Sequence, residues 1–387
     1  MGRHSKKGGT SGAPPPSKKV WYGEILIAAS GAGVLSTTVL YDHVRQSWDG
    51  LAADTAVLSA MYTVPDRAFE QLRERFAQPS DPQQPEQEQE KAQQPLIPPQ
   101  RQEEQPPPTK TQPPPEPVEI PEEYRGTVVE EDLAAAGSSL CFGSGRIKNA
   151  TSLSEQQVEE YLAQPQPFLL DRQGPQVLIM HTHATESFEP YDSEIYDTRH
   201  TWRSTDNSEN IVAAGEVMAQ AIRSHGIEVL HDDTQHDYPS YNGSYERSAE
   251  TVKEYLAKYP SIKVVLDVHR DAVQRDSTLV KPVTQINGKK AAQMMIIAGC
   301  DDGTMEMPNW GKNLRFAAGI QDAIESRWQG LTRPIFFCTE NTTRILTTGS
   351  LLLELGSHGN TLEQVLTTAQ LAGDAIGNYL AQECMAE

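Results

Sequence analysis

A short apolar segment leads into three side chains that can bind a metal ion or transfer a proton. Residues 177–191 read VLIMHTHATESFEPY, so four apolar residues precede His181, His183 and Glu186. If a strand continues through Thr182, the two histidines point to the same face, because side chains alternate along a strand. One helical turn after His183 would bring Glu186 to the same side. Histidines at strand ends are more often hydrogen-bonding residues than ligands, and we expect that structural role for His181.

Two further apolar segments end in residues of the same kinds. The segment SIKVVLDVHRD ends in Asp267, His269, Arg270 and Asp271. The segment SLLLELGSHGNT places Glu354 among leucines, where burial would penalise the charge of an isolated carboxylate. A nearby cation or a role in proton transfer would offset that penalty. A structural ion pair with Arg270 or Arg344 would do the same.

Two imidazoles and one carboxylate form a ligand set that suits Zn²⁺, and a catalytic zinc site keeps one coordination position open. The sequence therefore predicts a zinc site with two histidines and one glutamate as ligands. Glu354 would act as the general base toward water and then protonate the leaving amine. A site of this kind cleaves a peptide or amide bond. Phosphoesterases usually use two metal ions and more aspartate ligands than these segments contain.

The elements that must position these residues alternate between strands and helices from about residue 167. Apolar and β-branched runs predict strands covered on both faces at 176–180, 227–230, 262–268, 293–298, 334–338 and 350–355. Helical spacing predicts helices in SENIVAAGEVMAQAIRSHG, SYERSAETVKEYLAKYP, NWGKNLRFAAGIQDAIESRWQG and TLEQVLTTAQLAGDAIGNYLAQ. We expect an α/β fold, a three-layer domain with a mostly parallel mixed sheet. Ligands of such domains bind beyond the carboxyl ends of the strands, where the three segments end.

The N-terminal part of the chain has the composition of a membrane anchor. A basic tail, residues 1–19, precedes the apolar run VWYGEILIAASGAGVLSTTVLY at 20–41. A helix of this length can cross a bilayer core about 30 Å thick. The basic flank predicts that the tail stays in the cytoplasm, and the run lacks a good signal-peptide cleavage site. We expect a single-pass anchor in the cell membrane with the rest of the chain outside the cytoplasm.

The region after the anchor divides by composition. A short juxtamembrane segment at 42–76 precedes a linker at 77–122 that is rich in Pro, Gln and Glu. Because the linker has few large apolar residues, we expect a disordered spacer with a reach on the order of 100 Å. A lead-in segment, 123–166, connects it to a catalytic domain at 167–387.

Charge and cysteine content exclude several classes of function. The 387 residues include 33 Lys+Arg and 53 Asp+Glu, for a formal net charge of -20, which argues against binding nucleic acid through a basic surface. The four cysteines lack the short spacing of a CxxC redox centre or a zinc knuckle. They are Cys141, Cys300, Cys338 and Cys384.

Several motifs in order resemble those of a known family. HTHATESF, LDVHRD, NLRFA and ELGSHGNT are similar to motifs of the stage II sporulation protein P family of endospore-forming bacteria, over about residues 165–387. The resemblance implies a fold related to the zinc-dependent N-acetylmuramoyl-L-alanine amidases. It implies removal of stem peptides from peptidoglycan during engulfment of the forespore, and an endopeptidase activity on cross-links. The implied partners are the stage II sporulation proteins D and M.

The resemblance also assigns roles to individual residues. His183 and His269 match the family's metal histidines, and Glu354 matches its general base. Glu186 fits the ES that follows the first histidine, whereas related amidases place their zinc glutamate nearer the first helix, where this chain has Glu209. We prefer Glu186 as the ligand because its connection to His183 is short.

Arg270 and the overall activity each have alternative interpretations. Arg270 would stabilise a developing oxyanion or bind a substrate carboxylate, or it would anchor Glu354.

The domain could also bind peptidoglycan or recruit a partner without catalysis. The presence of every ligand type together with Glu354 argues against that inactive module. A metal-dependent deacetylase or phosphoesterase is a further alternative, and product identity distinguishes among the enzymes.

Overall fold

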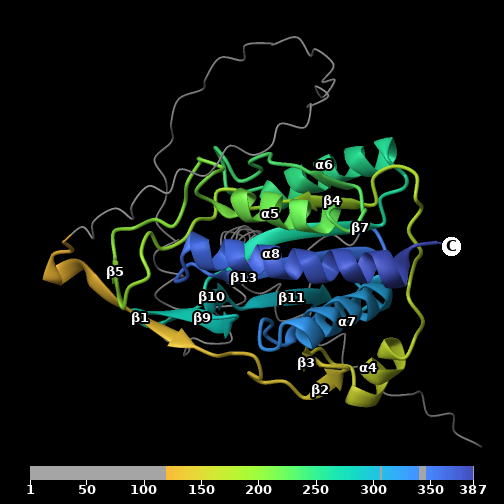
Figure 1. Cartoon of the computed structure of the whole chain (residues 1–387), viewed down its shortest axis with the longest axis horizontal. Helices are drawn as coiled ribbons and strands as arrows, with labels where there is room; N and C mark the ends of the chain where they lie inside the picture. Colours follow the sequence, from red (N-terminus) through yellow and green to blue (C-terminus); the bar gives the residue numbers. More distant parts are fainter. Residues whose placement is uncertain (1–118, 306, 340–345, 387) are drawn as a thin grey trace, which may run out of the picture. The chain divides into compact units, whose positions relative to one another are not determined.

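A central sheet of eight strands organises the computed structural model, which describes residues 119–305, 307–339 and 346–386 (Figure 1). The strands are Leu140–Phe142 (β2), Gly145–Ala150 (β3), Val177–Met180 (β4), Val229–His231 (β6), Val264–Asp271 (β7), Met294–Gly299 (β11), Ile335–Cys338 (β12) and Gly349–Ser357 (β13). Their spatial order is β2-β3-β12-β11-β13-β7-β4-β6. Pairing is antiparallel between β2 and β3 and between β11 and β13, and parallel between the other neighbours. The predicted α/β fold with a mixed sheet is confirmed.

Helices pack on both faces of this sheet. The helices are Glu155–Leu162 (α4), Ile211–Arg223 (α5), Ser244–Lys258 (α6), Trp310–Arg327 (α7) and Leu362–Tyr379 (α8), which continues into a π-helical turn at Leu380–Cys384 (η2). Helix α8 lies between α5 and α7 and contacts both (Figure 1). Helix α8 begins at a capping box, in which Thr361 Oγ1 accepts a hydrogen bond from the Gln364 N–H.

Strand β4 shows why the predicted strands read as continuous apolar runs. Val177 and Ile179 belong to the large core cluster that includes residues of α5, α7 and α8. Leu178 and Met180 point to the other face and pack with Val252 of α6. Because successive side chains alternate between two buried faces, every position of the strand must be apolar.

A second, smaller sheet was not predicted from the sequence. It consists of Arg125–Glu131 (β1), Ile195–Asp197 (β5), Gln274–Arg275 (β8), Thr278–Ile286 (β9) and Lys289–Ala292 (β10), and a 3-10 turn at Glu122–Tyr124 (η1) precedes it. The order is β10-β9-β1-β5, with β8 paired to β9. Several of these strands are only two to four residues long and carry charged residues. Lys281 of β9, for example, is buried beside the carboxylates of Glu130 and Asp192.

The segment 123–166 contributes to both sheets. Strand β1 pairs with β9 in the small sheet, and β3 pairs with β12 in the central sheet. Ile147 of β3 lies opposite Ile335 and is fully buried. This segment, expected to be a lead-in to the catalytic domain, therefore supplies part of its core.

The expected membrane anchor at 20–41, the segment 42–76 and almost all of the linker lie outside the described residues. Within the described ranges, no helix combines the length and apolar character needed to cross a membrane. No disulfide joins any of the four cysteines, of which Cys141 is exposed and the other three are buried.

Candidate active site

The three strands that carry the predicted site residues lie side by side in the central sheet. Strand β7 is flanked by β4 and β13 and runs parallel to both, so their carboxyl ends meet at one edge. Glu354 is paired in register with His269, which brings the two side chains to the same face of the sheet. His183, Glu186, His269 and Glu354 are each at most 2 % exposed. The structure therefore gathers all four at one buried place.

The chain leaves the sheet earlier than expected, and this separates the two histidines of the HTH motif. Strand β4 ends at Met180, and Thr182 donates its N–H and its hydroxyl to Asp267, at 2.9 and 2.7 Å. A turn follows, closed by a 3.1 Å hydrogen bond from the Glu186 N–H to the His183 carbonyl. The prediction that His181 and His183 share one face of a continued strand is wrong. The chain turns away from the sheet after Met180, and Thr182 donates its hydrogen bonds to the side chain of Asp267 instead of continuing the strand. His181 faces α5, and His183 faces the start of α6.

His183 lies in an aromatic setting. Its ring stacks on Tyr241 at 4.6 Å between centroids, and it meets the rings of Tyr245 and His269 edge-on at 5.3 and 5.2 Å. Tyr241 Oη is 3.2 Å from His183 Nε2. Burial lowers the pKa of His183 to about 3, so the imidazole is neutral. Its buried Nδ1 has no hydrogen-bond partner among the described residues.

His269 has two carboxylates beside it. Its Nε2 is 2.8 Å from Asp267 Oδ1, outside hydrogen-bonding geometry, and its Nδ1 is 3.6 Å from Glu186 Oε2. Burial alone would lower the pKa of His269, but these two charges outweigh it and hold the pKa well above its ordinary value. Burial likewise opposes ionisation of Glu186, yet Arg270, His269 and Arg203 keep its pKa below the usual range.

Glu354 forms no salt bridge with any of the described residues, and Arg344 lies outside them. Burial, together with the negative charges of Asp271 and Glu186, raises the pKa of Glu354 to about 8, although His269 and Arg333 act in the other direction. Its Oε2 is buried and has no hydrogen-bond partner in the part of the chain that is described. Of the nearby cations, Arg333 pairs with Asp271, at 2.7 Å.

Arg270 is held by backbone carbonyl groups. Its guanidinium donates to the carbonyl oxygens of Ser187, Trp202 and Asp271 at 3.1, 3.2 and 3.4 Å. Its backbone N–H donates to Glu186 Oε2 at 3.1 Å. These contacts stabilise the loop that carries Glu186, and a direct contact with substrate stays a prediction.

The two candidate carboxylate ligands differ in position. Glu186 is buried beside His269, as described above. Glu209 is exposed, and its Oε2 accepts a hydrogen bond from Ser204 Oγ at 3.4 Å. The geometry favours Glu186.

The chemistry of the donor atoms fits a zinc ion, but these atoms do not converge on a single position. Across the described residues, no three His, Cys, Asp or Glu side chains form a group that could hold a metal. The available donors are nevertheless a neutral imidazole with an unpartnered buried Nδ1, an ionised carboxylate and the imidazole of His269, which must release its extra proton to bind a metal. Zinc sites use this combination.

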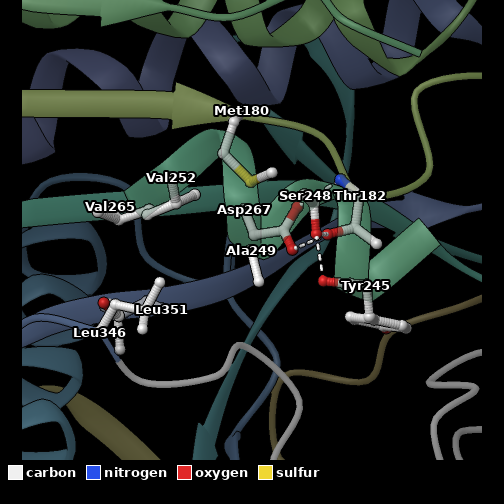
Figure 2. Close-up of a pocket in the computed structure, with 11 residues that line it drawn as sticks. Met180, Thr182, Tyr245, Ser248, Ala249, Val252, Val265, Asp267, Leu346 and Leu351 are labelled. Atoms are coloured by element: carbon white, nitrogen blue, oxygen red, sulfur yellow. Dashed lines mark hydrogen bonds between the residues drawn. The ribbon is translucent and has the colours of Figure 1, made fainter. Parts of the chain in front are cut away.

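A small cavity of about 20 Å³ lies beside the site, between α6 and the sheet (Figure 2). That volume is on the order of one water molecule. Oxygen atoms of Thr182, Ser248 and Asp267 converge on its polar side, with Thr182 Oγ1 2.8 Å from Ser248 Oγ (Figure 2). Asp267 also contacts His269, so the cavity adjoins the site rather than forming its centre.

Several residues of the site were not predicted from the sequence. Tyr241 and Tyr245 contact His183, and Arg203 Nη2 lies 4.0 Å from Glu186 Oε1. Tyr245 lies in the first turn of α6 but Tyr241 precedes the helix, so helical spacing gave no signal that both rings meet His183. Arg203 gave no such signal, because only the folded loop brings it back to Glu186.

Comparison with known proteins places the chain in a family. The model of the family described as "Stage II sporulation protein P" matches residues 57–377. The chain belongs to this family. A curated member, stage II sporulation protein P of Bacillus subtilis, is 26% identical over 244 residues, which are 59% of this chain and 57% of that protein. The family assignment inferred from the motifs is confirmed.

Solved structures of amidases show only a weak overall similarity to this member of the family. The apo form of an N-acetylmuramyl-L-alanine amidase, Ami1 from Mycobacterium abscessus, aligns with a TM-score of 0.31 and 13% identity, over 53% of this chain and 98% of the amidase. The CwlD amidase of Clostridioides difficile, solved with the GerS lipoprotein, gives a TM-score of 0.31 and 13% identity, over 53% and 95%. TM-scores this low do not establish a common fold.

Proposed function

We propose that this family member is a zinc-dependent peptidoglycan hydrolase that removes stem peptides from glycan strands during sporulation. The activity is that of an N-acetylmuramoyl-L-alanine amidase, with an endopeptidase activity on cross-links. One observation carries the proposal. Glu354, a carboxyl group in an apolar strand, is paired in register with His269 at the sheet edge where His183 and Glu186 are also buried.

Each residue of the site has a role in this reaction. His183, Glu186 and His269 would hold the zinc ion, which supplies Lewis acidity when bound. Glu354 takes a proton from the attacking water and delivers it to the amine nitrogen as the amide C–N bond breaks and a C–O bond forms. Burial favours the neutral form of Glu354, which delivers the proton, and a bound zinc ion would favour the carboxylate that accepts it first. Arg270 keeps the Glu186 loop in place through its carbonyl contacts.

The location and partners belong to the same proposal. The apolar run at 20–41 would anchor the protein in the cell membrane, and the linker at 77–122 would let the catalytic domain reach the wall from outside the cytoplasm. Stage II sporulation proteins D and M are the partners that the family resemblance implies. Co-purification of each from detergent extracts of sporulating cells, with the chain lacking 123–387 as control, tests this part.

Digestion of purified peptidoglycan by the full chain in detergent tests the activity. We expect mass spectrometry to detect released stem peptides, and a chelator to abolish the release. Glu354→Gln should lower the rate by about 10²–10⁴-fold, the usual contribution of a positioned acid–base group. Glu209→Gln is the matched control and should retain activity, because Glu209 is exposed.

Other products would redirect the proposal. Acetate or phosphate without stem peptide would identify a deacetylase or a phosphoesterase. Binding to peptidoglycan without any cleavage, unchanged by added zinc, would leave a wall-recognition module.

A further inference from the structure

The loop around residue 203 pairs with the segment that carries the candidate ligand Glu186. Glu186 and Arg203 form an antiparallel bridge, and backbone hydrogen bonds of 3.0 and 2.9 Å join the residues on either side of it. Trp202, one residue earlier, has a left-handed backbone with φ 46°, which is uncommon for a residue other than glycine. Such conformations persist where surrounding contacts hold them, and they are frequent beside functional sites. Arg203 has no role in the proposed reaction, yet its main chain lies beside that of Glu186.

The side chain of Arg203 forms an ion pair with a second acidic residue. Its Nη1 lies 2.8 Å from Asp237 Oδ2, and its Nη2 lies 4.0 Å from Glu186 Oε1. Asp237 also accepts hydrogen bonds from the Thr185 hydroxyl at 2.6 Å and from the Thr185 N–H at 3.2 Å. Because Thr185 directly precedes Glu186, Asp237 and Arg203 together hold both the main chain and the carboxylate at this point.

The guanidinium of Arg203 also lies over an aromatic ring. Its Cζ is 5.0 Å from the centroid of the Tyr241 ring. A cation within about 6 Å of an aromatic centroid is attracted to the face of the ring. The same ring is nearly parallel to the imidazole of His183, with 14° between the planes and 4.6 Å between the centroids. Arg203 therefore contacts Glu186 directly and reaches His183 through Tyr241.

The contacts explain why this residue is an arginine. The side chains of Asp237 and Glu186 are 0% and 2% exposed, and buried carboxylates need a cation as partner. A guanidinium carries five donors in one plane and stacks on aromatic rings, whereas the ammonium group of lysine is compact and strongly hydrated. Arg203 can therefore contact the carboxylates and the ring at the same time.

We propose that Arg203 is a positioning residue that fixes the side chains of His183 and Glu186 relative to each other. Its charge holds the carboxylate of Glu186, and its contact with Tyr241 keeps that ring stacked on His183. Residues that orient metal ligands in this way raise the affinity for the metal without binding it. The effect on zinc rests on the proposed hydrolase function, whereas the effect on the two side chains does not.

Proton NMR of the metal-free full chain in detergent, labelled with ¹³C at histidine, measures the geometry without zinc or substrate. The ring current of Tyr241 should shift the ring protons of His183, assigned with His183→Gln, and Tyr241→Ala gives their position without the stack. Arg203→Gln combined with Asp237→Asn removes the ion pair and leaves the net charge unchanged. We expect this double variant to move the His183 signals toward their position in Tyr241→Ala. Tyr241→Phe keeps the ring and should leave them near the wild-type position.

Zinc titration of the same variants by calorimetry measures the consequence for the ligands. We expect the double variant to bind zinc about 10–100-fold more weakly, the scale typical of residues that orient metal ligands. Arg203→Lys keeps the charge without the planar group and should cause smaller changes in the same direction in both measurements. A merely structural role would lower the melting temperature and leave the zinc affinity of the folded protein unchanged.

A second ion pair in the same part of the chain provides the matched control. Arg199 pairs with Asp197 at 2.6 Å, and the two side chains are 53% and 28% exposed. Arg199→Gln combined with Asp197→Asn makes the same chemical change there. We expect both the His183 signals and the zinc affinity to stay at their wild-type values in this control.

Two results would overturn the proposal. His183 signals that stay in place in the double variant would show that Arg203 does not hold the stacked ring. Displaced signals with unchanged zinc affinity would show that the contact does not position the ligands. If the double variant does not fold, Arg203→Lys decides, and wild-type values in both of its measurements would refute the proposal. If the wild type neither binds zinc nor cleaves peptidoglycan, the proposed function fails, while the spectra still decide whether Arg203 holds the ring on His183.

Discussion

The two histidines proposed to bind metal are equally buried and yet have opposite protonation preferences. His183 has aromatic neighbours, and burial lowers its pKa to about 3. His269 touches Asp267 and Glu186, which raise its pKa despite burial. Sequence motifs identified both residues, but their charges depend on contacts between strand ends and a loop. At the scale of single residues, identity was predictable and protonation was not.

Glu189 offers a test of how burial tunes a carboxyl group just outside the site. Burial, assisted by the charge of Asp197, raises the pKa of Glu189 to about 7, although Trp202 Nε1 donates a hydrogen bond to it at 2.5 Å. In the unfolded chain this group titrates near its ordinary value, 4.5. Folded-state stability therefore falls as the pH rises from about 4.5 to about 7, because only the unfolded state releases its proton.

We expect Glu189→Gln to remove this pH dependence. At pH 8 the variant should be more stable than wild type by on the order of 2–3 kcal/mol, and at pH 4 the two should be equal. Urea denaturation at both pH values measures the difference. Glu194→Gln, at an exposed position, is the control and should change stability little at either pH. A constant difference between Glu189→Gln and wild type would contradict the assignment.

At the scale of elements, long apolar runs were predictable and short charged strands were not. The strands expected at 262–268 and 350–355 correspond to β7 and β13, because both are buried on two faces and begin with mostly apolar sequence. The three-residue β5 has no such signal. The turn after Met180 was missed for another reason. Asp267, which accepts the hydrogen bonds of Thr182, lies on a different strand, so the local sequence does not show this contact.

The contact between α5 and α8 depends on a glycine and gives an element-scale prediction. A Cβ at Gly373 of α8 would lie 2.8 Å from both the Met218 carbonyl oxygen and the Ala221 Cβ of α5. Alanine is favoured over glycine in an isolated helix by about 1 kcal/mol. We nevertheless expect Gly373→Ala to destabilise the protein, by about 1–3 kcal/mol, because overpacking outweighs propensity.

Thermal unfolding followed by circular dichroism measures this effect. Thr367→Ala, in the same helix and half-buried, serves as control and should change the midpoint much less. A rise in the midpoint for Gly373→Ala would mean that the two helices are farther apart than the structure places them.

At the scale of the whole molecule, the folded unit begins earlier than residue 167. The segment before it buries Leu140, Ile147, Val158 and Leu162 in the main core cluster. The sequence did not reveal this, because β2 and β3 are short and gain their burial from distant partners such as β12. The predicted anchor and linker remain predictions at this scale.

Truncation tests the extent of the unit. The loss of four large buried side chains costs about 2–5 kcal/mol each. Together these losses are comparable with the usual free energy of unfolding of a domain, about 5–15 kcal/mol. We expect a chain that starts at 167 to be largely unfolded and readily proteolysed, and one that starts at 119 to be resistant. Equal protease resistance of the two would show that 119–166 is dispensable for folding.

Direct titration of zinc into the purified, metal-free full chain tests the central claim, that the side chains at the ends of β4 and β7 form a metal site. Calorimetry should show one zinc ion bound per chain. His183→Ala and His269→Ala should each weaken binding by more than the roughly 10–100-fold typical of residues outside the ligand set. Glu209→Ala should leave it unchanged. Zinc binding that survives both histidine substitutions, or no zinc binding by the wild type, would contradict the account.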